Sequence, residues 1–280
     1  MMTKRQEEGK KGGGEGSGIP SSLLPLLPSS LPPLPELLAH SHLLTERQRR
    51  LGSIGPVGPL LCVHSEAERD GEAVAVDRFF AADCSPAAAL LAMRNFGPAR
   101  DHLLFVVDAP AERQAAFVRA GFRLLETQWL MGCDLSRWQP SPRPTTAGSV
   151  NRAQTAADAV TLSAIDGLEA VPMDELRDPA LIHYYVAADK QPIAYGRHAR
   201  YDDAIAWVSQ VYTAPQHRRM GYASALMEQM LSDSADAAVA RSMLLATAMA
   251  HPLYARLGYA EIAIVAILHA PPALLRRGGR

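Results

Sequence analysis

The chain has 280 residues, of which 48% are hydrophobic and 20% are charged, and its formal net charge is −1. These values are typical of a globular protein with a sizeable core, and the neutral balance argues against a nucleic-acid partner bound through its phosphates. No apolar run of about 18 residues is free of proline or charge, so we expect no membrane-spanning helix.

Residues 1–59 are expected to form a disordered tail rich in Pro, Gly and Leu. The leucines of residues 19–38 resemble the core of a signal peptide, but five prolines would break a helix there. The pair Arg49-Arg50 resembles a twin-arginine signal, but it lies too deep in the chain. Three cysteines, Cys62, Cys84 and Cys133, show no CxxC spacing. We therefore expect a cytoplasmic protein without disulfides or a metal site, whose cysteines are inert buried thiols.

Residues 60–138 are predicted to form a small α/β lobe. A strand is expected at 60–66, followed by one or two helices over 71–97 that break near Ser85-Pro86. A buried strand at 102–107, a helix at 111–122 with Gly121 at its C-cap, and a strand at 123–135 follow. Three prolines in a polar stretch then predict a linker over 139–153.

Residues 154–272 are predicted to form the main domain, followed by a basic tail at 273–280. It begins with a helix at 155–171, and short polar turns then join three strands (180–187, 192–201 and 204–213) into an antiparallel meander. A helix at 221–240, a strand at 242–250, a short helix closed by Gly258 and a strand at 260–270 complete it. The expected fold class is α/β, with a central, mixed, mostly antiparallel sheet flanked by helices. Trp207, on the third strand, is expected in the core.

The most informative stretch joins the third strand to the next helix and reads VYTAPQHRRMGYASALM (residues 211–227). The start of a helix offers unpaired backbone N–H groups and the positive end of the helix dipole, which suit a pyrophosphate. Gly221 would let the backbone approach that anion closely, and Arg218 and Arg219 would add positive charge. A tight-turn glycine beside solvated arginines is the alternative interpretation.

The run Arg218-Arg219-Met220-Gly221-Tyr222-Ala223 resembles the Arg/Gln-x-x-Gly-x-Gly/Ala motif of the GNAT acyl-CoA-dependent N-acetyltransferases. The resemblance covers about 120 residues and implies a GNAT-type α+β fold. It also implies that the backbone N–H groups of six residues bind the coenzyme A pyrophosphate: Arg219, Met220, Gly221, Tyr222, Ala223 and Ser224. Val211 and Thr213 would pair with the pantetheine arm, and an N–H near Val211 or Tyr212 would stabilise the oxyanion.

A second resemblance lies in Leu253–Tyr259, which is similar to the Leu-Tyr-x-x-x-Gly-Phe segment of the family. It implies that Tyr254 protonates the departing thiolate, although Tyr254 could instead be a packed aromatic residue. His251-Pro252 stands where many members carry an Asn that contacts the coenzyme. His251 is thus a candidate proton shuttle, or a turn or N-cap residue.

The general base is not evident, because Ser209 and Gln210 occupy the central strand where a carboxylate would be expected. The alternatives are His251, a water relayed by Ser209, or one of the acidic residues Glu169, Asp174 and Glu175.

The first lobe resembles the back half of the second. Each contains a strand, a turn, a short helix ending in Gly-aromatic and another strand, and Phe117 precedes Gly121 as Tyr254 precedes Gly258. We interpret residues 60–138 as a degenerate GNAT-like lobe that shapes the acceptor groove or extends the sheet. Convergent α/β patterning is the alternative.

The leading hypothesis is therefore an N-acetyltransferase that uses acetyl-CoA as co-substrate, without a metal, and acetylates a primary amine directly in a ternary complex. The acceptor would be a small molecule or a peptide amine. No nucleic-acid or membrane partner is expected, and a homodimer stays open. The alternatives are a non-catalytic acyl-CoA-binding regulator and an enzyme that transfers a longer acyl chain.

Overall fold

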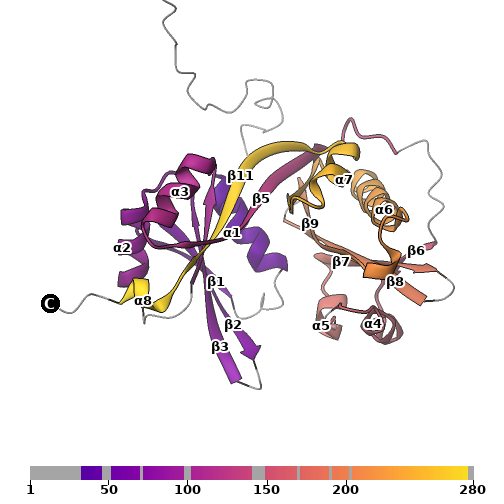
Figure 1. Ribbon diagram of the computed structural model, residues 1–280. Helices are drawn as coiled ribbons and strands as arrows, with labels where there is room; N and C mark the ends of the chain where they lie inside the picture. Colours follow the sequence, from indigo (N-terminus) through magenta and orange to yellow (C-terminus); the bar gives the residue numbers. More distant parts are fainter. Residues whose placement is uncertain are drawn as a thin grey trace, which may run out of the picture.

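The computed structural model describes residues 33–45, 52–69, 72–97, 102–140, 149–168, 171–188, 191–201 and 204–276. Its strands form one eleven-stranded sheet in the order β1-β2-β3-β4-β11-β5-β10-β9-β8-β7-β6 (Figure 1). Only the β3–β4 and β9–β10 pairs are parallel, so the expected mixed, mostly antiparallel sheet is confirmed. Within these residues, no helix is both long and apolar enough to cross a lipid bilayer.

The first half of the chain supplies two elements before the predicted lobe and six within it. They are α1 (Leu34–Thr45), β1 (Ser53–Val57), β2 (Leu60–Arg69), β3 (Glu72–Ala81), α2 (Pro86–Phe96), β4 (His102–Val107), α3 (Ala111–Arg119) and β5 (Arg123–Asp134).

The second half follows the predicted order of strands and helices closely. Its elements are β6 (Ser149–Ala153), α4 (Ala156–Ser163), α5 (Met173–Leu176), β7 (Leu181–Ala188), β8 (Gln191–Arg200), β9 (Ile205–Thr213), α6 (Tyr222–Asp236), β10 (Arg241–Ala246), α7 (His251–Arg256), β11 (Ala260–Ala270) and α8 (Pro272–Leu275). A 3-10 turn, Pro215–His217, lies between β9 and α6.

Four sequence-based expectations are wrong in detail. Residues 72–81 form strand β3 rather than a helix, because their alternating residues pair with β2 over its whole length. The proposed break at Ser85-Pro86 is instead the start of α2, where the Ser85 hydroxyl accepts a hydrogen bond from the Ala88 N–H at 3.2 Å. The linker contains β6, which pairs with β7, and the single helix expected at 155–171 is shorter and is followed by a separate turn of helix, α5.

The expected tail is not wholly disordered, since α1 and β1 both lie within residues 1–59. Leu37, Leu38 and Ala39 of α1 are completely buried. They join a core cluster with Phe80 and Phe105 of the first half and with residues of β9 and β10. Helix α1 therefore packs across both halves of the sheet (Figure 1). The remainder of the expected N-terminal tail, at 1–32 and 46–51, lies outside the described residues. The same holds for 277–280 of the expected basic C-terminal tail.

The two strand–helix–strand units that resemble each other in sequence, β4-α3-β5 and β10-α7-β11, also correspond in structure. Strand β5 lies between β10 and β11, and β11 lies between β4 and β5. Each unit thus ends in a strand that is inserted into the other half of the sheet, and Figure 1 shows β5 and β11 running together between the halves. Gly121 and Gly258 follow their helices with left-handed φ values of 99° and 94°.

The helices cover opposite faces of this sheet. Helices α6 and α7 pack on one face of the second half, where the buried side of α6 is formed by Ala225, Leu226, Met227, Met230, Leu231 and Ser234. Alternation along β5 and β11 places α2, α3 and α8 on the same face and α1 on the other. Helices α4 and α5 share the face of α1, over Tyr195. Strands β9 and β10 therefore have α6 and α7 on one face of the sheet and α1, α4 and α5 on the other.

We predict that Leu37→Ala lowers the free energy of unfolding by about 2–5 kcal/mol, because it opens a cavity beneath α1. Urea unfolding followed by circular dichroism measures the effect. Leu91→Ala in α2 is the matched control, since Leu91 is 61% exposed and its truncation should cost less than about 0.5 kcal/mol. Equal effects of the two substitutions would show that α1 does not pack on the sheet in solution.

Candidate active site

Strands β9 and β10 lie parallel but pair over three residues only, from Ile205↔Arg241 to Trp207↔Met243. Beyond Trp207, β9 continues to Thr213 without pairing to β10. Gln210 has a left-handed φ of 53°, and the register of β8 against β9 shifts between Tyr195 and Arg197. A bulge of this kind bends the strand and redirects its backbone groups. The strands therefore diverge and leave an edge of β9 open for another hydrogen-bonding chain.

The turn after β9 presents a run of unpaired backbone donors. Arg219 and Gly221 have left-handed φ values of 62° and 88°, and Gly221 is the N-cap of α6. The described residues supply no acceptor for the N–H groups of Arg219, Met220, Gly221, Tyr222, Ala223 and Ser224, and the first bond of the helix runs from Ala225 N to Gly221 O at 3.0 Å. A Cβ at position 221 would face open space. This concave run of donors at a helix N-terminus can bind an anion.

The arginines of this turn differ in position. The Arg218 Nε donates to the backbone oxygen of Thr213 at 3.1 Å, so this side chain closes the turn onto the end of β9. Arg219 and Met220 are exposed. Arg219 is thus placed to add positive charge beside the open N–H groups, whereas Arg218 also has a structural contact.

The last residues of β9 fix the strand from both sides. Val211 packs on the core beneath α6. On the opposite face, the Tyr212 hydroxyl donates to the backbone oxygen of Asp166 at 2.8 Å. The Thr213 Oγ1 atom is buried and has no hydrogen-bond partner among the described residues. An unsatisfied hydroxyl at this open strand edge could bind a polar group of a ligand.

Tyr254 and His251 lie one turn apart on α7. Tyr254 is 6% exposed, and its burial raises the pKa of its hydroxyl to about 12. Its ring lies 5.8 Å from that of Tyr259. The His251 Nε2 lies 2.6 Å from the Glu261 Oε1, and its ring meets Trp129 edge-on at 5.2 Å. The Glu261 carboxylate can therefore hold the orientation of the His251 ring.

A cavity of about 200 Å³ lies at the divergence of the two strands, on the side of the sheet that α1 covers. It is lined by His42 of α1, Arg197 of β8, Leu245 of β10, and four residues of β9: Trp207, Val208, Ser209 and Gln210. Of the acidic base candidates, Glu175 is buried next to this cavity, Asp174 is exposed, and Glu169 lies outside the described residues.

Three polar groups connect α5 to this cavity. The Arg197 Nη1 donates to the Glu175 Oε2 at 2.7 Å, and its Nε donates to the Ser209 Oγ at 3.2 Å. Neither Arg197 nor His42 was predicted as a site residue from the sequence. An arginine within the apolar alternation of β8 was the available signal, but its partner Glu175 lies 22 residues away. Trp207, expected in the core, also forms part of the cavity wall.

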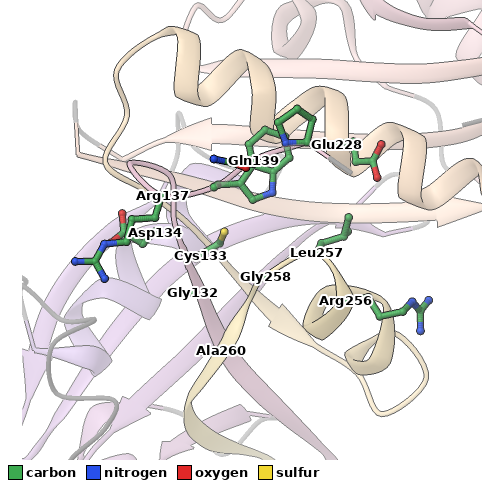
Figure 2. A pocket seen from close by; sticks show the side chains of 12 residues that line it. Gly132, Cys133, Asp134, Arg137, Gln139, Glu228, Arg256, Leu257, Gly258 and Ala260 are labelled. Atoms are coloured by element: carbon green, nitrogen blue, oxygen red, sulfur yellow. The ribbon is translucent and has the colours of Figure 1, made fainter. Parts of the chain in front are cut away.

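A larger pocket of about 540 Å³ lies near the end of α7 and contains none of the predicted site residues. Figure 2 shows around it Arg256 at the end of α7 and Leu257 just after it, Glu228 from α6, and Asp134 at the end of β5 with Arg137 three residues further on. The Cys133 thiol in its wall has its pKa raised to about 12, first by burial and then by Asp134, so it is protonated and a poor nucleophile. This pocket shares no lining residue with the cavity at the strand divergence.

No group of three or more His, Cys, Asp or Glu side chains within the described residues could hold a metal ion. The site consists instead of a divergent strand pair, a run of free N–H groups on one side and a polar cavity on the other. Such a site can bind an extended ligand with an anionic group and admit a second molecule from the opposite face.

Comparisons with known proteins agree with this geometry. The family model of the acetyltransferase (GNAT) domain matches residues 180–261. A GCN5-related N-acetyltransferase from Kribbella flavida aligns with 85% of this chain and 96% of its own, with 19% identity and a TM-score of 0.61. A GCN5-related N-acetyltransferase from Sphaerobacter thermophilus aligns with 79% of this chain and 82% of its own, with 15% identity and a TM-score of 0.51. No curated protein matches this chain.

A third similar structure is a GCN5-related glucosamine N-acetyltransferase region of a fungal multi-domain GH3 β-N-acetylglucosaminidase. It covers 75% of this chain and 31% of that one, with 13% identity and a TM-score of 0.52. At these identities the likeness shows the fold alone. Because the Kribbella flavida alignment spans 85% of the chain, the shared fold includes residues of both halves of the sheet.

Two buried histidines beneath the site predict acid sensitivity. The pKa values of His183 and His198 are lowered to about 4, mainly by burial, and Arg197 contributes to the shift of His183. In the unfolded chain each titrates near about 6.5, so the unfolded state binds more protons between these values and stability falls as the pH falls from about 6.5 to 4.

We predict a slope of about 1.4 kcal/mol per pH unit from each histidine near pH 5. Urea titrations at several pH values measure this slope. His198→Gln should remove about one histidine's share of it, and an unchanged slope would contradict the assignment of His198 as a buried neutral imidazole.

Proposed function

Since residues 180–261 of this chain form a GNAT acetyltransferase domain, we propose that the protein transfers an acetyl group from acetyl-CoA to a primary amine. The observation that supports the proposal best is the run of six N–H groups from Arg219 to Ser224, for which the described part of the chain supplies no acceptor, beside the edge of β9 that does not pair with β10. The run suits a pyrophosphate, and the strand edge suits the amide groups of a pantetheine arm. Acetyl-CoA would supply the acetyl group as a reactive thioester.

Acetyl-CoA and the amine would bind on opposite faces of the sheet. On the α6 face, the open N–H groups would hold the pyrophosphate, with Arg219 adding charge and Gly221 allowing close approach. Thr213 and the backbone of Val211 would hold the pantetheine arm. A backbone N–H near Val211 or Tyr212, at the bulge around Gln210, would stabilise the negative charge that develops on the acetyl oxygen.

Tyr254 would act on the departing thiolate. Its pKa of about 12 means that the hydroxyl is fully protonated at neutral pH and can donate a hydrogen bond. Complete proton transfer to a thiolate, whose ordinary pKa is about 8.5, would be uphill. Tyr254 therefore fits the role of a hydrogen-bond donor that stabilises the thiolate.

The amine must lose a proton before or during attack, and two arrangements could accept it. A water held by Ser209 in the cavity would lie on the acceptor side, where Arg197 fixes the hydroxyl. His251, supported by Glu261, lies on α7. We favour the water at Ser209, because this residue lines the cavity from which the amine would approach. Direct attack needs no covalent enzyme intermediate.

A non-catalytic acyl-CoA-binding protein is the second candidate function. The observation that favours it is the cavity wall, because none of the described residues that line it is a carboxylate that could serve as a general base. The two functions differ in whether acetyl-CoA is consumed when an amine is supplied.

Calorimetric titration of acetyl-CoA into the full chain tests the binding site. We expect micromolar binding, about −8 kcal/mol, and at least a hundredfold loss in Gly221→Asp, which places a carboxylate against the anion and forces a side chain into a left-handed backbone. Gly97→Asp is the matched control, because Gly97 ends α2 in extended backbone with no atom near its would-be Cβ. Equal binding by both variants would remove the proposed pyrophosphate site.

Tyr254→Phe tests the hydroxyl without changing the packing, and Phe117, fully buried at the corresponding position of the first half, shows that this fold accepts phenylalanine there. We expect kcat to fall by roughly tenfold to a hundredfold, because a hydrogen bond to a charged leaving group is lost, with acetyl-CoA affinity unchanged. Thiol release with an amine panel measures kcat. An unchanged rate would exclude Tyr254 from the reaction.

A further inference from the structure

The wall of the cavity at the β9–β10 divergence contains an arginine but no acidic residue among the residues that line it. Arg197 is its only lining residue with a permanent charge, and the others are histidine, apolar, hydroxyl or amide residues. No carboxylate lines the cavity within the described residues. A simple ammonium ion entering it would meet the Arg197 guanidinium but no lining carboxylate, because Glu175 lies behind the wall and is already paired with Arg197. The wall is therefore complementary to a molecule that also carries an anionic group.

Arg197 is held rigidly in this wall. It is 1% exposed, its Nη1 donates to the Glu175 Oε2 at 2.7 Å, and its Nε donates to the Ser209 Oγ at 3.2 Å. Because both contacts are already formed, a ligand would not have to order this long side chain, and less entropy would be lost on binding.

The guanidinium has further donors available. Its five N–H groups make only two recorded hydrogen bonds to the described residues, one from Nη1 and one from Nε. The outer edge of a guanidinium, formed by one N–H of each Nη atom, fits the two oxygens of a carboxylate in a bidentate pair. Glu175 keeps the buried charge stable without a ligand, and the cavity gives access to the group that it supports.

The opposite wall comes from outside the acetyltransferase domain. Helix α1 contributes His42, whose ring packs against Phe80 and Phe105 at 5.2 and 4.6 Å. The position of α1, fixed by its buried leucines, therefore limits the size of the molecule that fits beside Arg197.

We infer that the acceptor is a small amine that also carries a carboxylate, an amino acid or a related compound, and that Arg197 binds this carboxylate. The inference rests on the proposed function, since it assigns the cavity to the acceptor. Arg197 is then a residue that determines specificity: its effect falls on acceptor binding, while the acetyl-CoA site on the other face of the sheet is unaffected.

The test compares amino acids with the amines obtained by removing their carboxylate: glycine with methylamine, β-alanine with ethylamine, phenylalanine with phenethylamine, and lysine with cadaverine. Binding of each to the full chain saturated with coenzyme A is measured by saturation-transfer NMR, and thiol release from acetyl-CoA gives kcat and KM. For at least one pair, we expect the amino acid to bind and react at least tenfold better than its amine, because a bidentate charged pair is gained.

The double variant Arg197→Gln/Glu175→Gln removes both charges and leaves no buried ion unpaired. It should abolish the carboxylate preference in KM and in acceptor binding, with coenzyme A binding and the melting temperature nearly unchanged. Because Arg197 also holds the Ser209 hydroxyl, any fall in kcat should be the same for both members of a pair. Arg197→Lys, which keeps the charge but loses the planar fork, should retain part of the preference. Arg200→Gln is the matched control, since this arginine lies on the same strand but contacts the Ala237 backbone oxygen at 3.3 Å, on the α6 face.

The outcomes separate the two hypotheses. A carboxylate preference that disappears in the double variant supports the inference, and it does so in the binding measurement even if no amine is acetylated, in which case the proposed function fails alone. Acetylation without a preference in any pair, or a preference that survives in the double variant, overturns the inference and leaves the proposed function standing. Absence of binding by every amino acid of the panel also overturns it.

Discussion

The geometry of the site depends on how β10 divides its pairing between its two neighbours. Strand β10 pairs with β5 along all six of its residues, from Arg241↔Asp134 to Ala246↔Trp129, but with β9 over three only. The longer ladder fixes the direction of β10, and β9 separates from it after Trp207. The opening between the strands thus results from a strand of the first half, whose insertion between β10 and β11 makes one sheet of the two halves.

This exchange gives the first half a structural role. Its strand β5 completes the second half, as β11 completes the first. Its residues Phe80 and Phe105 also pack against His42 of α1. The corresponding unit β4-α3-β5 carries Phe117 where β10-α7-β11 carries Tyr254, so the hydroxyl that the proposed reaction needs is present in the second unit only. The first half therefore holds the site in shape and contributes a wall to it.

The two faces of the sheet offer different chemistry at the same opening. On the α6 side, the backbone itself supplies the donors, because the left-handed Arg219 and Gly221 turn successive N–H groups outward. On the α1 side, side chains from four elements surround a small cavity, with a buried arginine held between a carboxylate and a hydroxyl. An anion and an acceptor could thus approach β9 from opposite directions without competing for the same groups.

The sequence by itself determined the local features of this protein. Helix α6 with its buried face, the strands of the meander, the glycines after α3 and α7, and the turn around Gly221 all follow from periodicity and backbone preference within a few residues. The tertiary structure decided what depends on distant partners. Strand β3 resembled a helix until its pairing with β2 was known, and α1 lay within a proline-rich segment whose leucines reveal their role only when packed on the sheet. The Arg197–Glu175 pair and the cavity beside it join separate elements, and the insertion of β5 and β11 joins residues more than a hundred positions apart. No short-range pattern encodes such contacts, because the free energy that stabilises them comes from burial and pairing that exist only in the folded chain.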